Sequence, residues 1–479
     1  MKYYHFTAIA VARYARCMSS DTEHLATTFA HFVCASAYQD LPATAVHAAK
    51  RAIVDTVGVA VGALHDDASS PILNYVRNVS SGAGLCTVIG QHERAAPEMA
   101  ALANGTLAHL LDFDDTHNPM GGHPSAPVLS AALAMADHAG ASGRDLILAF
   151  VAGFEVTTKL ARVTNPLLYS RGWHPTSVLA VFGAAAAAAK LLRLDKAQMT
   201  HALAAAASMA SGMKANFATL TKPLHVGRAA QAGVQSAMLA ACGHTANPAI
   251  FEAPMGYLDL YCSQKQEDWK LGTVEKRLGE PWEIVQPGVT VKPYPCGGST
   301  HSTIDAHLAL RAQHEFASSD IVKIRNGIHA RRLPHTSRPV VTRGLEGKFS
   351  NQYVTALCWL KGSVLLAHFD DATAGDPAMA EMMRKVQTYA EPEISASAEE
   401  THALVEVTLR DGTVYQQRTT KRRGSPANPL SDAELGEKFR SCVPLVFSRE
   451  KTERLLERIW KLDSLQSARA LTTELAAQS

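Results

Sequence analysis

Three carboxylates and two imidazoles gather within a dozen residues of this chain. Asp112-Phe-Asp-Asp-Thr116-His117 is followed closely by His123-Pro-Ser. The stretch falls between two apolar, helix-like segments, and burying polar groups costs free energy unless they are paired or hydrogen-bonded. A solvated turn with an aspartate helix cap would account for the same residues without any chemistry. The other polar residues along the chain favour an active site.

Basic and imidazole side chains recur at further breaks between apolar segments. His174 and Lys222 each stand directly before a proline, and Lys292 opens a Pro- and Gly-rich loop that leads to His301. Because the residue before proline avoids the helical region, we expect Lys222 to lie in an extended or turn segment. A lone His is more often a hydrogen-bonded core residue, and a lone Lys is usually solvated. These residues nevertheless all stand at helix breaks, and such breaks are where rigid scaffolds display functional groups.

Two lysines together with several histidines suit a polycarboxylate substrate. Ammonium groups neutralise carboxylates and stabilise the negative charge that develops when a proton leaves carbon next to a carboxylate. Histidine, with an ordinary pKa of about 6.5, can take or return that proton near neutral pH. Asp112 or Asp115 could orient a histidine and fix its tautomer, as supporting carboxylates do.

A divalent metal site is the rival chemical interpretation. The oxygen and nitrogen ligands would come from Asp112, Asp114, Asp115, His117 and His123. Their spacing matches no metal motif with a clear mechanism, so we predict no metal. The sequence also has no G-x-G-x-x-G after a strand, no P-loop and no G-x-S-x-G elbow, which leaves nucleotide-dependent and α/β-hydrolase mechanisms unsupported. Cys296 could be a nucleophile, although most free cysteines are structural.

Composition excludes several classes of partner. At 479 residues the chain exceeds the size that one core usually serves, so two domains are expected. The net charge of +2 comes without a basic stripe, which argues against nucleic-acid binding. No apolar run reaches the roughly 20 residues of a membrane span. The eight cysteines form no C-x-x-C pair, which favours a reducing compartment and a cytoplasmic location.

Hydrophobic periodicity divides the chain into three parts. Residues 24–264 read as helices, several rich in alanine, at 45–62, 99–111, 127–138, 183–194 and 199–213. Residues 268–423 mix helical segments at 300–313 and 353–368 with strand-like segments at 289–292, 321–328 and 404–410. Asp411-Gly412 predicts a hairpin turn. Helices return at 430–442 and 449–477 and could pack back on the first part.

Several of these segments resemble the MmgE/PrpD family. The strongest similarity is carried by Leu111-Asp-Phe-Asp-Asp-Thr-His117 and Gly122-His-Pro-Ser-Ala-Pro-Val128. Five further segments follow in the order of the family: Gly172-Trp-His-Pro-Thr176, Thr221-Lys-Pro-Leu-His225, Lys292-Pro-Tyr-Pro-Cys296 with Thr300-His301, Lys348-Phe-Ser-Asn-Gln-Tyr353, and Gly424-Ser-Pro-Ala-Asn-Pro429. Together they cover most of the chain beyond about His24.

The resemblance implies a mainly α fold, with a large all-helical domain and a smaller α+β lid domain. We place the helical domain at residues 24–267 and 425–479, the lid at 268–424, and an N-terminal extension at 1–23. The resemblance also implies a homodimer, an active site between the domains, and no cofactor. By matching motif, the residues lining the substrate site would be Asp112, Thr116, His123, His174, Lys222 and Lys292.

Members of this family dehydrate 2-methylcitrate, decarboxylate cis-aconitate or epimerise iminodisuccinate. The decarboxylases carry a His a few residues beyond the lid lysine, where this chain has Cys296-Gly297-Gly298 and the nearest His is His301. This chain also has one more residue between Thr116 and His123 than those members.

We therefore expect dehydration of a 2-methylcitrate-like hydroxy acid, with decarboxylation or epimerisation of a small di- or tricarboxylate at the same site as alternatives. A relative without activity that only binds a ligand is a further possibility. The predicted catalytic residues are His123, His174, Lys222, Lys292 and Asp112, with Thr116, His301 and Tyr353 binding substrate.

Overall fold

The computed structural model describes residues 24–80, 84–263, 265–269, 271, 274, 277–396 and 402–477, so the expected extension at 1–23 lies outside the described part. The chain forms two compact units. Unit 1 holds residues up to 110, residues 114–289 and residues from 432 onward. Unit 2 holds residues 290–431 together with the three residues Leu111–Phe113.

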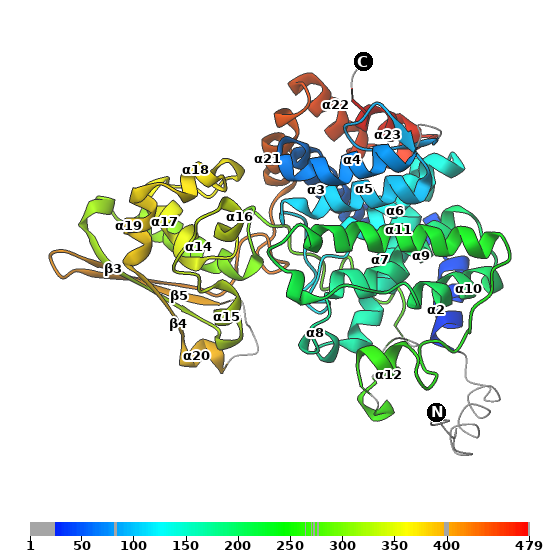
Figure 1. The fold of residues 1–479 in the computed structure, drawn as a ribbon, viewed down its shortest axis with the longest axis horizontal. Helices are drawn as coiled ribbons and strands as arrows, with labels where there is room; N and C mark the ends of the chain where they lie inside the picture. The colour runs from blue at the N-terminus through cyan, green and yellow to red at the C-terminus, as the bar shows by residue number, and fades with distance from the viewer. Residues whose placement is uncertain are drawn as a thin grey trace, which may run out of the picture. The chain divides into compact units, whose positions relative to one another are not determined.

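Unit 1 is built of helices (Figure 1). Before residue 290 these are α2 (Leu25–Ala35), α3 (Ala43–Gly62), α4 (Ser70–Ser80), α5 (Pro97–Leu110), α6 (Ser125–Ala139), α7 (Gly143–Thr164), α8 (Leu167–Ser170), α9 (Pro175–Leu191), α10 (Lys196–Ala207), α11 (Thr221–Ala241) and α12 (Tyr257–Tyr261). Two short strands, β1 (Cys86–Thr87) and β2 (Arg94–Ala95), pair antiparallel.

Small side chains let the central helices of unit 1 approach closely. Helix α9 is buried along nearly its whole length and packs against α7 and α11, and α11 also packs against α5. At the crossing of α5 and α11, a Cβ atom on Gly227 would lie 2.3 Å from the carbonyl oxygen of Leu102. One on Gly105 would lie 2.9 Å from the Cα of Gly227. The two backbones therefore touch where only glycine fits.

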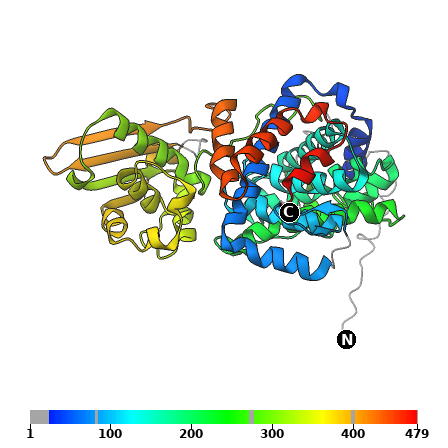
Figure 2. The same ribbon diagram turned by 90° about the horizontal axis from the view of Figure 1, so that it is seen from above.

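The C-terminal helices belong to unit 1. They are α21 (Asp432–Cys442), α22 (Arg449–Trp460) and α23 (Arg469–Leu475), drawn in orange to red in Figure 2. Helix α21 packs against α3, as does α22, while α23 contacts α6. Each of these contacts joins the end of the chain to helices from its first third.

Unit 2 is a four-stranded sheet with helices. Its strands are β3 (Ile321–Ile328), β4 (Val386–Ala390), β5 (Ala403–Leu409) and β6 (Val414–Thr419), in the order β4-β3-β5-β6. Strands β3 and β4 are parallel and the other pairs antiparallel. The helices are α14 (His301–Gln313), α15 (Leu333–Thr336), α16 (Gly344–Gly347), α17 (Asn351–Leu360), α18 (Asp371–Ala374), α19 (Pro377–Arg384) and α20 (Pro392–Ser395).

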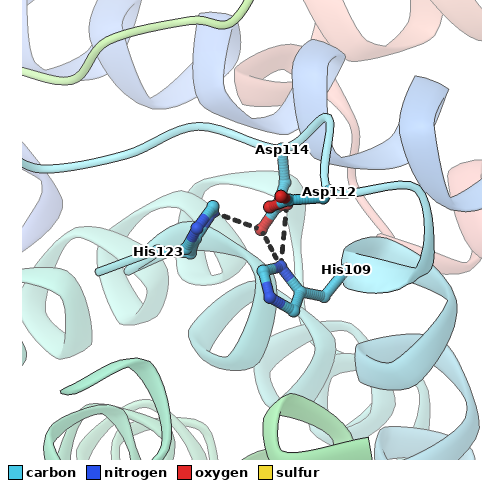
Figure 3. Close-up of side chains that lie close together, drawn as sticks. All are labelled: His109, Asp112, Asp114 and His123. Atoms are coloured by element: carbon cyan, nitrogen blue, oxygen red, sulfur yellow. Dashed lines mark hydrogen bonds and ion pairs between the residues drawn. The ribbon is translucent and has the colours of Figure 1, made fainter. Parts of the chain in front are cut away.

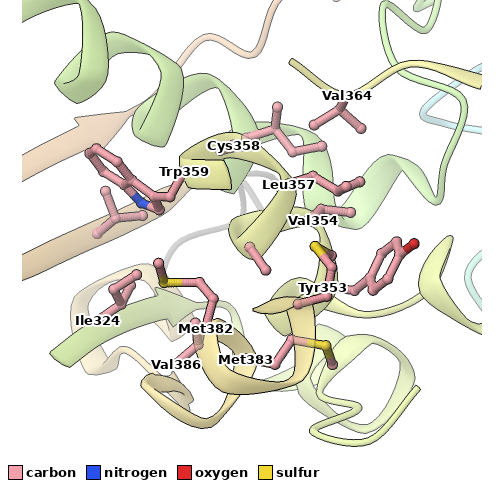
Figure 4. Packing of buried hydrophobic residues seen from close by; sticks show 14 of the residues in the cluster. Ile324, Tyr353, Val354, Leu357, Cys358, Trp359, Val364, Met382, Met383 and Val386 are labelled. Atoms are coloured by element: carbon pink, nitrogen blue, oxygen red, sulfur yellow. The ribbon is translucent and has the colours of Figure 1, made fainter. Parts of the chain in front are cut away.

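The core of unit 2 lies between one face of the sheet and the helices α14, α17 and α19 (Figures 1 and 4). Alternate residues of β5, including Val405 and Val407, are buried in it, as the two-residue period of a strand requires. Tyr353, Leu357 and Trp359 of α17 contribute to the same core.

The predicted fold class is confirmed: the protein is mainly α, with a large helical part and a smaller α+β part. The Asp411-Gly412 turn joins β5 to β6 as predicted, with Gly412 at a φ of 88°. The strand expected at 289–292 does not form, because the amide of Val291 bonds to the carbonyl of Gly424 outside any ladder and Pro293 has no N–H to donate.

Two predicted helices are shorter than expected: α10 ends at Ala207 and α17 at Leu360. Within the described part of the chain, no helix combines the length and the apolar character that a membrane span requires.

Candidate functional site

The polar loop between α5 and α6 holds a buried carboxylate between two imidazoles (Figure 3). Nδ1 of His109 lies 2.9 Å from both carboxylate oxygens of Asp114. Nδ1 of His123 lies 3.1 Å from Oδ2 of the same carboxylate. The two rings meet edge to face, with their centroids 4.4 Å apart. Asp114, rather than the predicted Asp112 or Asp115, is thus the carboxylate that orients histidines.

Neighbouring elements hold each member of this group in place. His109 lies in the last turn of α5, and Asp114 follows in the loop. His123 stands one residue before Pro124, the N-cap residue of α6. Its backbone amide donates to Oγ1 of Thr176 on α9. The loop is therefore attached both to its own helices and to α9.

Lys222 extends the group from α11. Its Nζ lies 2.9 Å from Nε2 of His109, on the side of the ring opposite Asp114. The expectation that Lys222 lies outside a helix is wrong, because it is the second residue of α11. A proline is tolerated in the first turn, where its missing N–H would have no partner within the helix. The lysine reaches His109 because α5 and α11 touch at Gly105 and Gly227.

His174 adds a further imidazole to unit 1. It is the N-cap residue of α9, in the extended conformation that the following Pro175 favours. Its Nδ1 lies 3.1 Å from Nδ1 of His225 on α11, and its ring centroid lies 6.0 Å from that of His109. Phe217 packs edge to face on it at 4.9 Å.

Burial decides the charge of these groups. It lowers the pKa of His109 to about 3, although Asp114 opposes the shift. Burial, with Lys222 next in effect, also places the pKa of His174 well below its ordinary value and lowers that of His225. For Asp114 burial acts to raise the pKa, but His109 and His123 outweigh it and hold the pKa well below the ordinary value. The cluster thus combines the ionised carboxylate of Asp114 with the neutral imidazoles of His109, His174 and His225.

Unit 2 contains a second buried ion pair. Nζ of Lys292 lies 2.9 Å from Oδ1 of Asp112 and donates to the carbonyl oxygen of Asp112 at 2.7 Å. Lys348 donates to the neighbouring carbonyl of Leu111 at 2.7 Å. Asp112 has a φ of 52°, a left-handed conformation that costs free energy for residues other than glycine. Such strain often marks functional positions.

The other predicted site residues of unit 2 have structural surroundings. Nε2 of His301 lies 3.1 Å from the carbonyl of Cys296, and burial holds the pKa of His301 well below its ordinary value. Tyr353 is fully buried in the core, and its hydroxyl donates to the carbonyl of His368. Burial raises the pKa of the Cys296 thiol to about 12, which argues against a nucleophile.

In unit 1, Thr116 is half-buried in the loop of Asp114. The roles predicted for Thr116, His301 and Tyr353 in binding substrate stay predictions.

Two members of the ligand set considered for a metal, Asp115 and His117, have other partners in unit 1. The hydroxyl of Ser125 donates to Asp115 at 2.5 Å, and Nε2 of His117 lies 3.3 Å from a carboxylate oxygen of Glu283. His109, Asp114 and His123 do offer ligand atoms within 4.8 Å of one another. A carboxylate placed between two imidazole Nδ1 atoms is equally the arrangement of a hydrogen-bonded network.

The sequence did not point to His109 as a functional candidate. It indicated Asp114 only as a possible metal ligand and His225 only as part of a family motif. A signal for two of them was present. His225 stands three residues after Lys222, one turn along the same helix face. His109 stands in the last turn of an apolar helix that leads into the aspartates.

Comparison with known proteins decides the family. The MmgE/PrpD N-terminal domain matches residues 27–270, and the MmgE/PrpD C-terminal domain matches residues 294–463. The chain belongs to the MmgE/PrpD family. The resemblance seen in the sequence motifs is thereby confirmed.

Three MmgE/PrpD relatives cover almost the whole chain. The cis-aconitate decarboxylase of Homo sapiens is 32% identical over 450 residues, which is 91% of each chain. The cis-aconitate decarboxylase of Aspergillus terreus is 25% identical over 462 residues, 91% of this chain and 92% of that one. The 2-methylcitrate dehydratase of Cupriavidus necator is 23% identical over 458 residues, 88% of this chain and 90% of that one.

Proposed function

We propose that this protein is a cofactor-independent lyase that decarboxylates a cis-aconitate-like tricarboxylate. The observation that carries the proposal is a buried series of side-chain contacts. The ammonium of Lys222 contacts the neutral ring of His109, and that ring contacts the Asp114 carboxylate. The same carboxylate contacts His123. The identity to cis-aconitate decarboxylases, 31% to the enzyme of Mus musculus over 449 residues, favours decarboxylation over the dehydration expected from the motifs.

The chemistry uses charge stabilisation and one proton. When one carboxylate leaves as carbon dioxide, the electron pair of the broken bond stays on the carbon skeleton. A second carboxylate, conjugated with the neighbouring carbon–carbon double bond, delocalises that negative charge. The ammonium of Lys222 stabilises the charge. A protonated His123 then returns a proton to carbon. The substrate loses carbon dioxide and gains one proton, so no oxidant or reductant is needed.

The ion pair of unit 2 also has a proposed role. We assign Lys292 to hold a substrate carboxylate and Asp112 to orient this lysine, the roles that the sequence motifs imply. Thr116 completes the predicted contacts. A homodimer and a cytoplasmic location are part of this proposal. Sedimentation of the purified protein tests the dimer.

Dehydration is the second candidate, and one observation favours it. The decarboxylase members carry a His near the position of Gly297 and Gly298. A Cβ on Gly297 would lie 3.2 Å from the ring of Phe349, and one on Gly298 3.2 Å from the guanidinium of Arg422. Both places are filled in this protein, so an imidazole there would displace its neighbours. If carbon dioxide release depends on that His, this chain should dehydrate a hydroxy acid instead.

Proton NMR in deuterated water separates these reactions. Purified protein is given cis-aconitate, 2-methylcitrate and a panel of related di- and tricarboxylates. Decarboxylation gives a product that has lost one carboxylate and carries one deuterium, whereas dehydration gives a new alkene and rising ultraviolet absorbance. Deuterium entering unchanged acid without loss of water or carbon dioxide identifies an epimerase. No turnover across the panel rejects the proposal.

A ligand-binding protein without activity makes a different prediction. A tricarboxylate would then raise the melting temperature of the wild type and of His123→Ala equally, and neither would turn it over. Under the proposed lyase function, the wild type turns over substrate and His123→Ala does not.

A further inference from the structure

The Asp114 carboxylate contacts two imidazole rings, and in each ring the contacting atom is Nδ1. Nδ1 of His109 lies 2.9 Å from both of its oxygens, and Nδ1 of His123 lies 3.1 Å from Oδ2. An ionised carboxylate has only acceptors, so the hydrogen bond to His109 requires a proton on its Nδ1. The His123 contact lacks hydrogen-bond geometry in this structure, but at 3.1 Å the carboxylate still favours a proton on Nδ1 of that ring. A neutral imidazole with its proton on Nδ1 carries its lone pair on Nε2.

The other side of His109 agrees with this tautomer. Its Nε2 lies 2.9 Å from Nζ of Lys222, and an ammonium has donors and no acceptor. Only a lone pair on Nε2 makes that contact a hydrogen bond. A proton on both nitrogens is opposed by burial, since the ring is 1% exposed. The two neighbours of His109 therefore select the same one of its two neutral forms.

We propose that Asp114 and His109 are positioning residues: Asp114 holds His109 and His123 with their protons on Nδ1, so that Nε2 of His109 aims the ammonium of Lys222 and Nε2 of His123 is the atom that exchanges a proton with substrate. This inference rests on the proposed function for its catalytic consequence. The tautomers themselves follow from the contacts.

The arrangement has two distinct consequences for turnover. When His123 carries the proton in transit, its imidazolium faces the Asp114 carboxylate, which stabilises that charge as the buried aspartate of a catalytic triad does. Lys222 is held by a neutral ring, which takes one of its hydrogen bonds without cancelling its charge. Loss of Asp114 should thus affect the proton-transfer step, and loss of the Nε2 acceptor should affect the handling of the anionic substrate.

Three substitutions separate these consequences. Asp114→Asn keeps the shape but can present a donor in place of an acceptor, and we expect kcat to fall by about 100-fold or more, because His123 then favours the wrong tautomer. His109→Gln can place an amide oxygen near the position of Nε2 and still accept from Lys222. His109→Asn can donate to Asp114 in place of Nδ1 but is too short to reach Lys222.

We expect kcat/KM of His109→Asn to lie at least about tenfold below that of His109→Gln, mainly through KM. His307→Asn is the matched control, since His307 is also fully buried and hydrogen-bonded but lies in the core of unit 2. It should lose stability while its kcat and KM stay near the wild-type values. A purely structural network would instead lower the activity of both His109 variants equally, in proportion to their melting temperatures, and would overturn the proposal.

Nitrogen NMR of the histidine rings tests the tautomers without any turnover. In protein labelled on its histidine nitrogens, and assigned through the single variants, His109 and His123 should both show the Nδ1–H form in the wild type. Asp114→Asn should shift His123 toward Nε2–H, whereas the contact with Lys222 should keep His109 in the Nδ1–H form. Nε2–H in the wild type overturns the proposal. If the wild type turns over no polycarboxylate, the proposed function fails, and the NMR result still confirms or overturns the positioning.

Discussion

Nζ of Lys222 lies 2.9 Å from Nε2 of His109, although 113 residues separate them in the chain. Both side chains are buried. A buried lysine usually pairs with a carboxylate, which cancels its charge. A neutral imidazole orients the ammonium without placing a negative charge beside it, which suits the polycarboxylate substrate that we propose.

Replacement of this lysine should remove activity at little cost in stability. Lys222→Gln loses the positive charge but can still donate to His109, so we expect kcat/KM to fall by about 10²- to 10³-fold, the typical loss for one charge-stabilising donor. Steady-state kinetics with the substrate found by NMR measures it.

Lys190 supplies a matched control. Its ammonium donates to the backbone carbonyls of Val33, Cys34 and Ser36 and has only a structural task. Lys190→Gln should lower the melting temperature and leave kcat/KM within about threefold. Equal activity losses in Lys190→Gln and Lys222→Gln would contradict the role assigned to Lys222.

The close crossing of α5 and α11 should be needed for activity. Gly227→Ala places a methyl group against Leu102 and Thr106, which pushes α11 away from α5 and lengthens the contact between Lys222 and His109. Overpacking of this kind costs about 1–3 kcal/mol of stability. We expect a loss of kcat/KM beyond what the remaining folded fraction explains.

Gly183→Ala tests that interpretation. Its Cβ would clash with Thr157 and with the carbonyl of Gly153, where α9 meets α7. It should destabilise the protein to a similar degree but keep more activity per folded molecule than Gly227→Ala. The reverse order would argue that the crossing of α5 and α11 does not position the site.

The strained conformation of Asp112 allows stability and chemistry to be separated. Asp112→Ala and Asp112→Gly both remove the carboxylate partner of Lys292 and keep its backbone carbonyl acceptor, so both should lose activity to a similar extent. Only glycine relieves the left-handed backbone, so Asp112→Gly should be more stable than Asp112→Ala by about 1 kcal/mol. Urea unfolding measures the difference. Arg193→Gly, at a φ of 55°, should gain stability in the same way without loss of activity.

Chelation should not affect turnover. Asp114 already accepts from His109 and lies 3.1 Å from Nδ1 of His123, and the proposed mechanism draws its positive charge from lysines. Activity after dialysis against a chelator should stay within about twofold of the starting value, and added Zn²⁺ or Mg²⁺ should not increase it. Loss on chelation with recovery on adding one ion would assign His109, Asp114 and His123 to a metal instead.

Buried histidines should make the protein less stable in mild acid. Burial lowers the pKa of His307 to about 4, and the ring is fixed between Asn326 and Trp359. The unfolded chain binds a proton near pH 6.5 and the folded one only near pH 4, so the contribution of His307 is fully present above pH 6.5. It is lost as the pH falls through this interval, by about 1.4 kcal/mol at pH 5.5.

The test compares urea unfolding of the wild type and His307→Gln at pH 7.5 and pH 5.5, followed by tryptophan fluorescence. The variant should be less stable at pH 7.5, and its deficit should shrink by about 1.4 kcal/mol at pH 5.5. The exposed His92, changed to Gln, should leave the pH dependence as it is. A deficit that stays constant or grows in acid would show that the burial of His307 does not have this effect.

Much of the fold could be predicted because it depends on local patterns. The apolar spacing in Ala43–Gly62 and the turn at Asp411-Gly412 specify a helix and a hairpin wherever they lie. Extended segments were harder: residues 289–292 have strand-like content, but a strand exists only when a neighbour offers a ladder, and here the amide of Val291 finds a loop carbonyl. Lys222 was misplaced because proline is compatible with the first turn of a helix as well as with an extended segment.

The sequence by itself indicated the kind of chemistry that we propose, since lysines, histidines and aspartates at helix breaks suit charge stabilisation and proton transfer at a carboxylate. It also determined the mainly α fold, through hydrophobic periods that depend only on neighbours along the chain. Only the tertiary structure decided which carboxylate serves which base. Asp112 pairs with Lys292, and Asp114 lies between His109 and His123. Those pairings depend on helix crossings such as that of Gly105 with Gly227, which bring together residues that no spacing along the chain relates.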